Sequence, residues 1–213
     1  MYKLVLFDFD GTLADTSEGI INSHKFAYQS MGKSVPSDSV LYSVIGGPLL
    51  ETYITRFGFD DDSARESVAY YRDFYARQGI CQARLYDGVK DFLESLRSNN
   101  ILAGIATLKA ERFAKIMAKN LGIYDFFTVI HGIDGDDKSS KAQIIERCMK
   151  DVGVSPSDTL MIGDSIHDYN GAVAAGTDFA GVSYGFGFHE VTYDDIYVFG
   201  SLAEIGSVVL MKK

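Results

Sequence analysis

From residue 88 onward, the chain alternates between helical periodicity and short apolar stretches typical of buried strands. The helical pattern covers 89–99, 109–121, 141–152, 166–175 and 202–210, and the strand pattern covers 101–107, 127–131, 158–163, 179–182 and 196–199. Strands that are separated by helices pair in parallel, and the helices then cover both faces of the sheet. The alternation therefore predicts an α/β fold built on a doubly wound parallel sheet.

The stretch from 15 to 85 breaks this alternation. A first strand is expected near 3–8, and it is followed by helical patterns that begin near residue 16 and continue at 37–45, 48–57 and 61–79. We therefore expect a Rossmann-like core formed by 1–14 and 86–213, with 15–85 inserted as an all-helical cap. An insertion after the first strand belongs at the carboxyl end of the sheet, where open α/β sheets bind ligands.

The first expected strand ends in two acids. The apolar run from Leu4 to Phe7 leads directly to Asp8 and Asp10, and Gly11 follows. Two carboxylates at this edge are costly to bury unless a cation neutralises them. Mg²⁺ is the natural candidate because it takes oxygen ligands. The alternative is an ordinary Asp-Gly turn after a strand.

Further polar residues fall at other expected strand and helix ends. Thr107 ends one strand, Asp164 follows another with Asp168 four residues later, and Lys141 begins a helix. Each has an ordinary explanation by itself: a hydroxyl at a strand end, a solvated lysine, and acids that cap a helix and complement its dipole. Together they supply acids, a hydroxyl and an ammonium at one edge of the sheet, which are the groups that phosphoryl transfer requires.

The order of these residues resembles the four motifs of the haloacid dehalogenase superfamily, in its phosphatase branch. The match spans nearly the whole chain and consists of Asp8-Phe9-Asp10-Gly11-Thr12, Thr107, Lys141 and Gly163-Asp164-Ser165-Ile166-His167-Asp168. The resemblance implies a Rossmann-like sheet with a helical cap after the first strand. The acid at position 10 favours phosphatases, because dehalogenases of this superfamily lack one there and its transporting ATPases have Thr.

By this resemblance, Asp8 is expected to be the nucleophile that attacks phosphorus and forms an aspartyl-phosphate. Asp10 is expected to be the general acid and base, which protonates the leaving oxygen and then activates water. Mg²⁺ is expected to be held by the Asp8 carboxylate, the backbone carbonyl of Asp10 and Asp164. Asp168 is expected to bind a metal-bound water or to steady Lys141.

By the same resemblance, Thr107 and Lys141 are expected to bind the phosphoryl oxygens. The backbone N–H groups of Phe9, Gly11 and Leu108 are expected to be further donors. Leu108 departs from the family pattern, which usually has a small or amide side chain there. This departure leaves a backbone donor intact but could narrow the pocket. Lys109, which follows, is expected to face the substrate.

Substrate specificity is expected to reside in the cap. Gly46 and Gly47 interrupt the helical pattern and permit close approach of backbone to a ligand, although a simple turn between helices explains them equally well. Arg56 and Arg72 are candidates to bind a carboxylate or second anionic group, or are ordinary surface charges. A resemblance to phosphoglycolate phosphatases and 5′-nucleotidase-like phosphatases rests on the stretch 45–75 and on Tyr184-Gly185-Phe186-Gly187.

Composition excludes several classes of partner. The net charge of −9 argues against a nucleic-acid or anionic-membrane surface, since both need clustered Lys and Arg. No apolar run approaches the roughly 18 residues of a membrane span. Cys81 and Cys148 form no Cys-x-x-Cys pair, so we expect reduced, buried thiols. With no signal-peptide pattern, we expect a cytoplasmic monomer or homodimer whose partner is a small phosphorylated metabolite.

The function expected from these features is Mg²⁺-dependent hydrolysis of a small phosphate monoester, as in phosphoglycolate phosphatases. A 5′-nucleotidase and a phosphosugar mutase, which would return the phosphoryl group to a sugar, stay open as alternatives. Receiver domains of signalling proteins also combine acids, a Thr and a Lys on a doubly wound sheet. Their phosphorylated Asp follows the third strand, however, and here the stretch 127–131 has no such Asp at its end.

Overall fold

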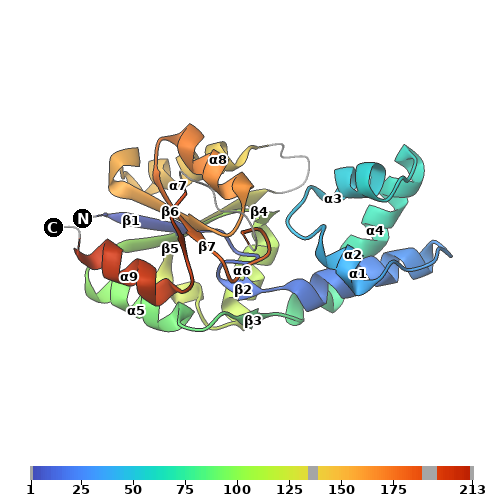
Figure 1. The fold of residues 1–213 in the computed structure, drawn as a ribbon. Helices are drawn as coiled ribbons and strands as arrows, with labels where there is room; N and C mark the ends of the chain where they lie inside the picture. The colour runs from blue at the N-terminus through green and yellow to red at the C-terminus, as the bar shows by residue number, and fades with distance from the viewer. Residues whose placement is uncertain (1, 134–138, 189–195, 212–213) are drawn as a thin grey trace. The chain divides into compact units, whose positions relative to one another are not determined.

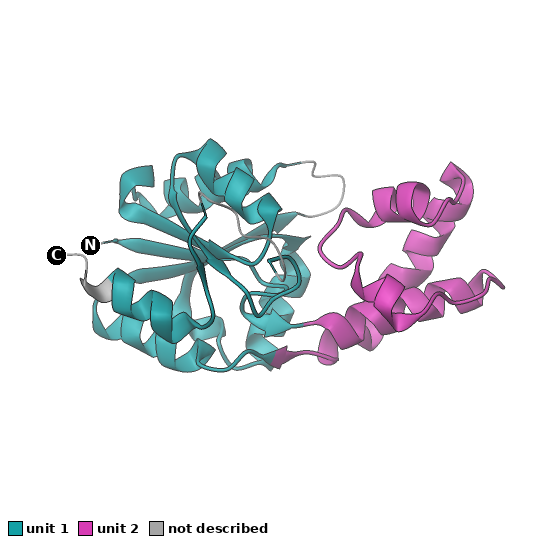
Figure 2. Cartoon of the chain, viewed as in Figure 1, with its two compact units in different colours: residues 1–15, 85–213 teal, residues 16–84 magenta. Residues whose placement is uncertain are grey.

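A computed structural model describes residues 2–133, 139–188 and 196–211. The chain divides into two compact units (Figure 2). The larger unit comprises residues 1–15 and 85–213, and the smaller unit comprises residues 16–84. The two connections between them are therefore close to residues 15 and 85, on either side of the helical stretch.

Six parallel strands form the sheet of the larger unit, in the order β5-β4-β1-β6-β7-β8 (Figure 1). Their bounds are β1 (Leu4–Phe7), β4 (Leu102–Ala110), β5 (Phe127–Ile133), β6 (Thr159–Gly163), β7 (Asp178–Val182) and β8 (Val198–Phe199). Counted within this sheet alone, the order is the 3-2-1-4-5-6 of doubly wound Rossmann-like sheets, in which ligands bind where the strand order reverses. The predicted fold class is confirmed, and the reversal lies between β1 and β6.

Helices cover both faces of this sheet. Figure 1 shows α7 (Lys141–Val152) and α8 (Ile166–Ala175) on one face, and α5 (Val89–Ser98) and α9 (Leu202–Met211) on the other. Helix α6 (Glu111–Asn120) packs against β4 and β5. Single 3₁₀ turns, η3 (Tyr124–Phe126) and η4 (Pro156–Asp158), precede β5 and β6.

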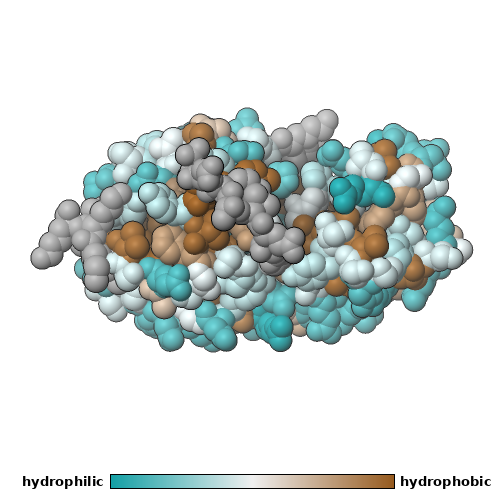
Figure 3. All heavy atoms as spheres, viewed as in Figure 1, coloured by the Kyte–Doolittle hydropathy of each residue, from teal (hydrophilic) through white to brown (hydrophobic). Residues whose placement is uncertain are grey.

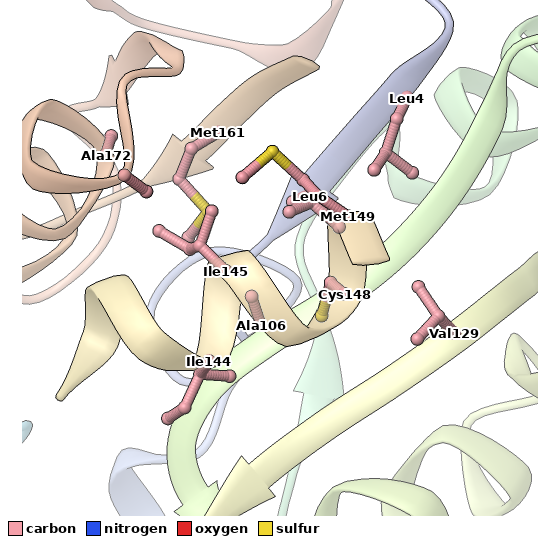
Figure 4. Close-up of a cluster of buried hydrophobic side chains, with 11 residues drawn as sticks. Leu4, Leu6, Ala106, Val129, Ile144, Ile145, Cys148, Met149, Met161 and Ala172 are labelled. Atoms are coloured by element: carbon pink, nitrogen blue, oxygen red, sulfur yellow. The ribbon is translucent and has the colours of Figure 1, made fainter. Parts of the chain in front are cut away.

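The main hydrophobic core fills the space between the sheet and helix α7 (Figure 4). All four residues of β1 are buried, as expected for a central parallel strand. Helix α7 contributes a stripe of adjacent side chains at helical spacing, and burial of each large apolar side chain stabilises the fold by roughly 1.5–3 kcal/mol. The residues that meet here include Leu4, Leu6, Val129, Ile144, Ile145, Cys148, Met149 and Met161. This core fixes the positions of the strand ends that carry the polar residues.

Several local expectations are wrong. Strand β4 runs to Ala110, whereas the sequence pattern predicts a helix from Lys109. The chain continues as a strand because Ala110 pairs with Ile133 of β5 beyond an irregularity in the register. Two short strands, β2 (Ala14–Asp15) and β3 (Arg84–Leu85), form a separate two-stranded sheet that was not expected. Cys148 is buried as predicted, but Cys81 is exposed.

Apart from connecting segments and Arg84, the first residue of β3, the smaller unit is helical. It contains α1 (Ser17–Ser30), α2 (Asp38–Tyr42), α3 (Leu49–Glu51), the π-helical turn η1 (Thr52–Arg56), α4 (Asp61–Arg77) and the 3₁₀ turn η2 (Gly79–Cys81). Helix α1 packs against α4 over an aromatic core. His24 lies within this core, with Nδ1 3.1 Å from the hydroxyl of Tyr53. Burial lowers the pKa of His24 to about 4, so this imidazole is neutral at pH 7.

Apolar side chains at the surface are interspersed with hydrophilic ones on the face drawn in Figure 3. Val173 of α8 and Val208 of α9 are among the most exposed of them. Scattered exposure of this kind is normal for a folded domain. Within the part of the chain that the structure describes, no helix combines the length and the apolar character needed to cross a bilayer.

Candidate active site

The carboxyl ends of three neighbouring strands bring the predicted residues of the core together. Asp8 follows β1 directly, Thr107 lies in β4, and Asp164 follows β6. Phe7 of β1 is in register with Ile105 of β4 and Ile162 of β6, so the residues that follow lie side by side. The site therefore occupies the point where the strand order of the sheet reverses.

Lys141 links two of the acids. Its Nζ lies 2.6 Å from Oδ1 of Asp8 and 2.6 Å from Oδ1 of Asp168, and only 4% of its side chain is exposed. It begins α7, which Ser140 caps through a reciprocal pair of hydrogen bonds with Gln143. Burial by itself lowers the pKa of Lys141, but the charges of Asp168 and Asp8 outweigh this and hold it above its usual value. Lys141 is therefore a permanent cation between two carboxyl groups.

Asp168 has a second role in the same contact network. Its Oδ2 accepts hydrogen bonds from the backbone N–H and the hydroxyl of Ser165, at 3.1 and 2.7 Å. The bond from the backbone N–H of Ser165 is one half of a capping box at the start of α8, and the other half runs from the backbone N–H of Asp168 to the side chain of Ser165. Asp168 therefore fixes the helix start with one oxygen and Lys141 with the other.

Asp164 is held by loops from both ends of the chain. The hydroxyl of Thr12 donates to its Oδ1 at 3.2 Å, and the backbone N–H of Phe186 donates to its Oδ2 at 2.6 Å. Burial, together with the charges of Asp168 and Asp8, raises the pKa of Asp164 to about 8 despite these two donors. An anionic carboxylate at this position is therefore costly unless a further positive charge is present.

Asp8, Asp164 and Asp168 form the acidic cluster of the site, in which one carboxylate oxygen of each lies within 4.8 Å of those of the others. Lys141 contacts two of the three, so the cluster carries an excess of two negative charges when all groups are ionised. Burial raises the pKa of Asp8 to about 6, with Lys141 opposing the shift. A set of oxygen donors with two uncompensated charges fits a hard divalent cation.

Asp10 lies beside this cluster and has its own cation. Both of its carboxylate oxygens are within hydrogen-bond distance of Nζ of Lys109, at 2.9 and 3.1 Å. The sequence predicted that this lysine faces the substrate, which stays a prediction, and the structure pairs it with Asp10. This ion pair is the main feature of the site that the motif order does not contain.

The other expected phosphate-binding positions lie in β4 and in the turn after β1. Thr107 is buried, and its hydroxyl oxygen accepts a hydrogen bond from the backbone N–H of Lys109 at 3.2 Å. Leu108 points away from these residues, because alternate residues of a strand face opposite sides and its side chain packs against the main hydrophobic core. Gly11 has a φ of +83°, and a Cβ on it would lie 2.2 Å from Oδ2 of Asp164. Only glycine fits this turn.

The four predicted specificity residues belong to the smaller unit, where all of them are exposed. Gly46 and Gly47 follow α2, and Gly46 has a φ of +89°. Arg56 ends η1, and Arg72 lies in α4. Their proposed contacts with a substrate stay predictions.

The sequence pattern did not show how Asp164 is held. Tyr184 donates a hydrogen bond from its hydroxyl to the backbone carbonyl of Thr12 at 3.0 Å, and Phe186 contacts Asp164 itself. The available signal was the spacing of Gly185 and Gly187 between aromatic residues. A Cβ on Gly185 would lie 2.3 Å from Cβ of Asp164, so this loop passes directly over the acid.

Comparison with known proteins agrees with this arrangement. A family model described as haloacid dehalogenase-like hydrolase matches residues 5–182. The chain belongs to the haloacid dehalogenase-like hydrolases. Among curated members, it is 36% identical over 187 residues to a 5′-nucleotidase of Pseudomonas aeruginosa, covering 87% of this chain and 85% of the relative. The predicted family is confirmed, and with it the prediction of an enzyme.

Other members carry different names. The chain is 34% identical over 186 residues to the tyrosine-protein kinase PtkA of Mycobacterium tuberculosis, covering 87% of this chain but only 63% of that protein. It is 30% identical over 194 residues to a phosphoglycolate phosphatase of Thiobacillus denitrificans, covering 86% of this chain and 84% of the relative. A solved structure of a predicted phosphatase from Clostridium acetobutylicum superposes with a TM-score of 0.90 at 32% identity, covering 99% of both chains.

Proposed function

We propose that this haloacid dehalogenase-like hydrolase is a phosphatase that hydrolyses the phosphate monoester of a small metabolite through an aspartyl-phosphate on Asp8. The observation that carries the proposal is the position of Asp8 at the end of β1, 2.6 Å from the buried ammonium of Lys141 and beside Asp164. A carboxylate next to a fixed cation can approach an anionic phosphoryl group, because the cation offsets the repulsion between the two anions.

In the first step, an oxygen of Asp8 forms a bond to phosphorus while the bond from phosphorus to the ester oxygen breaks. Asp10 gives its proton to the departing oxygen, so the alcohol leaves in neutral form. In the second step, Asp10 accepts a proton from a water molecule that attacks phosphorus. The bond from phosphorus to Asp8 then breaks, which releases inorganic phosphate and restores both carboxyl groups.

The other residues hold the phosphoryl group. Lys141 and the hydroxyl of Thr107 are proposed to bind its oxygens, with the backbone N–H groups of Gly11 and Leu108. Asp168 keeps Lys141 in place through the 2.6 Å contact between their side chains. Lys141 is fixed before the substrate arrives by its contacts with Asp8 and Asp168. The N–H of Gly11 donates to the carbonyl oxygen of Ala14 at 2.9 Å, so this bond must open before Gly11 can bind a phosphoryl oxygen.

We further propose Mg²⁺ as the cofactor, held by the carboxylates of Asp8 and Asp164 and the backbone carbonyl of Asp10. The fit rests on the acidic cluster, whose oxygen donors and excess of two negative charges match a hard divalent ion. When bound, such an ion neutralises charge on the phosphoryl oxygens. The raised pKa of Asp164, about 8, is consistent with a carboxyl group that needs a nearby cation to ionise.

For the substrate, phosphoglycolate is the first candidate and a nucleoside monophosphate is the second. The resemblance of the stretch 45–75 extends to both kinds of phosphatase and does not separate them. The 30% identity to the T. denitrificans phosphoglycolate phosphatase supports the first candidate, and the 36% identity to the P. aeruginosa 5′-nucleotidase supports the second. A phosphosugar mutase is the weaker alternative. The expected cytoplasmic location and the choice between monomer and homodimer stay predictions.

The test is phosphate release from 2-phosphoglycolate, AMP, p-nitrophenyl phosphate and glucose 1-phosphate, with Mg²⁺ and with EDTA. Asp8→Asn should lower kcat about 10³-fold or more, because the nucleophile is lost while the shape is kept. Asp91→Asn, on an exposed residue of α5, is the matched control and should retain activity. Turnover by Asp8→Asn at the wild-type rate would show that the assigned nucleophile is wrong, and formation of glucose 6-phosphate would favour the mutase.

A further inference from the structure

Lys109 is a buried cation in the site that the proposed reaction leaves without a role. Its Nζ lies 2.9 Å from Oδ1 and 3.1 Å from Oδ2 of Asp10, and only 6% of its side chain is exposed. Lys141, the other ammonium of the site, contacts Asp8 and Asp168 instead. The site thus assigns one lysine to the proposed nucleophile and a different one to the proposed general acid and base.

The backbone of Lys109 is held firmly. It belongs to β4, two residues beyond Thr107, and its backbone N–H donates a hydrogen bond to the hydroxyl oxygen of Thr107 at 3.2 Å. On the neighbouring strand β5, Gly132 lies so close that a Cβ on it would be 2.3 Å from the carbonyl oxygen of Lys109. Arg147 of α7 donates a hydrogen bond to the carbonyl of Gly132 at 3.1 Å, which anchors that strand in turn. The ammonium therefore extends from a fixed point.

Asp10 occupies a less confined position. It precedes Gly11, whose φ of +83° turns the chain, and 18% of its side chain is exposed. A carboxyl group in such a turn can rotate about its side-chain bonds unless a contact restrains it. Lys109 supplies this restraint, because its ammonium contacts both carboxylate oxygens at once.

We propose that Lys109 is a positioning residue that holds the carboxyl group of Asp10 in the orientation needed to protonate the leaving oxygen. This inference rests on the proposed function, in which Asp10 exchanges protons with the leaving group and with water. Proton transfer requires donor and acceptor atoms within about 2.6–3.2 Å of each other, so loss of the restraint reduces the fraction of productive encounters. Lys109 acts through Asp10 and transfers no proton itself.

Substrates with different leaving groups distinguish a residue that positions Asp10 from one that binds the substrate or supports the fold. An alkyl alcohol is a poor leaving group and needs the proton of Asp10, whereas p-nitrophenol leaves readily as its anion. Lys109→Met keeps an unbranched, mainly apolar side chain of similar length but removes the ammonium. Because general acid catalysis contributes about 10²–10⁴-fold, we expect kcat to fall by about 100-fold on an alkyl phosphate and by less than about 5-fold on p-nitrophenyl phosphate.

The experiment measures kcat and KM for wild type, Lys109→Met and Lys109→Arg. The substrates are p-nitrophenyl phosphate and whichever of AMP, 2-phosphoglycolate and glycerol 2-phosphate the wild type hydrolyses fastest. Lys109→Arg should stay within about 5-fold of wild type on both, since a guanidinium can also contact both oxygens. Lys115→Met, on a lysine of α6 that is 42% exposed, is the matched control and should change neither substrate's kinetics.

A second measurement tests the dependence on Asp10. In an Asp10→Asn background, Lys109→Met should cause no further loss on the alkyl phosphate, because the group that it positions no longer transfers a proton. If Lys109→Met does not fold, Lys109→Gln replaces it in both measurements.

Three outcomes would overturn the inference. Equal losses on both substrates would indicate a structural role for Lys109, and a raised KM with unchanged kcat would indicate contact with the substrate. A wild-type enzyme that hydrolyses none of these esters would overturn the proposed function and this inference together. Activity of the wild type without a substrate-selective loss in Lys109→Met would refute only the role of Lys109.

Discussion

Replacement of Lys141 by methionine should destabilise the protein strongly and in a pH-dependent way. The substitution leaves Asp8 and Asp168 without their shared counter-ion, at a site where the lysine side chain is 4% exposed. Removal of one partner from a buried ion pair costs about 3–5 kcal/mol. For a chain of this length, that corresponds to a fall in Tm of about 10 °C at pH 8.

The stability lost in Lys141→Met should be smaller at pH 5 than at pH 8. Burial raises the pKa of Asp8 to about 6, so at pH 5 this group is already mostly protonated and has little ion pairing to lose. The expected loss of stability at pH 5 is therefore smaller than that at pH 8.

Thermal melts followed by circular dichroism, in EDTA at pH 5 and pH 8, provide the measurement. Lys3→Met is the matched control, since Lys3 contacts Asp158 at 2.8 Å but the two side chains are 68% and 33% exposed. A surface pair of this kind contributes at most about 1 kcal/mol. Equal Tm values for Lys141→Met and Lys3→Met at pH 8 would contradict this prediction. So would a fall in the Tm of Lys141→Met that is the same at pH 5 and pH 8.

Two further predictions concern the same group of acids. Metal-free protein should lose stability as pH rises from 5 to 9, because burial raises the folded-state pKa of Asp8 to about 6 and that of Asp164 to about 8, above unfolded values near 4, so the folded state binds more protons in this range. Melts in EDTA should show this decline and Mg²⁺ should reduce it, whereas a flat or rising profile would contradict the raised pKa values. Gly163→Ala should cost about 1–3 kcal/mol and lower phosphatase activity more than 10-fold, because its Cβ would lie 2.3 Å from Cβ of Asp168. Gly200→Ala is the control and should match wild type in thermal melts and in phosphate release, since the atom nearest to its Cβ would be 3.4 Å away. Equal behaviour of the two variants would show that the end of β6 can shift.

Most of the larger elements could be predicted because each depends on local burial. Helix α7 over Lys141–Val152 and helix α8 over Ile166–Ala175 have the predicted bounds, since their apolar stripes and flanking glycines are read directly from the sequence. The helical pattern gave a wrong prediction at Lys109, where it placed the start of a helix. The run from Lys109 to Arg112 favours a helix locally, but pairing of Ala110 with Ile133 extends β4 instead. That pairing joins residues 23 positions apart, which no local periodicity records.

The candidate site divides in the same way. Motif order was sufficient to select Asp8, Thr107, Lys141 and Asp164, because acids and donors placed at the ends of parallel strands must share one edge of the sheet. It was not sufficient to pair them. The contact of Lys141 with both Asp8 and Asp168 depends on how α7 packs against α8, and that packing is set by the shapes of side chains in the main core.

The sequence alone therefore determined the fold class, the family and the residues of the candidate site that are expected at the strand ends. Only the tertiary structure decided that Lys109 contacts Asp10 and that the loop carrying Tyr184 and Phe186 holds Asp164. The physical reason is that residue type and spacing report which side chains are buried and on which strand end they fall. Charge pairing and hydrogen bonding depend on distances of a few ångströms between segments far apart in the chain, and those distances are fixed only when the core has packed.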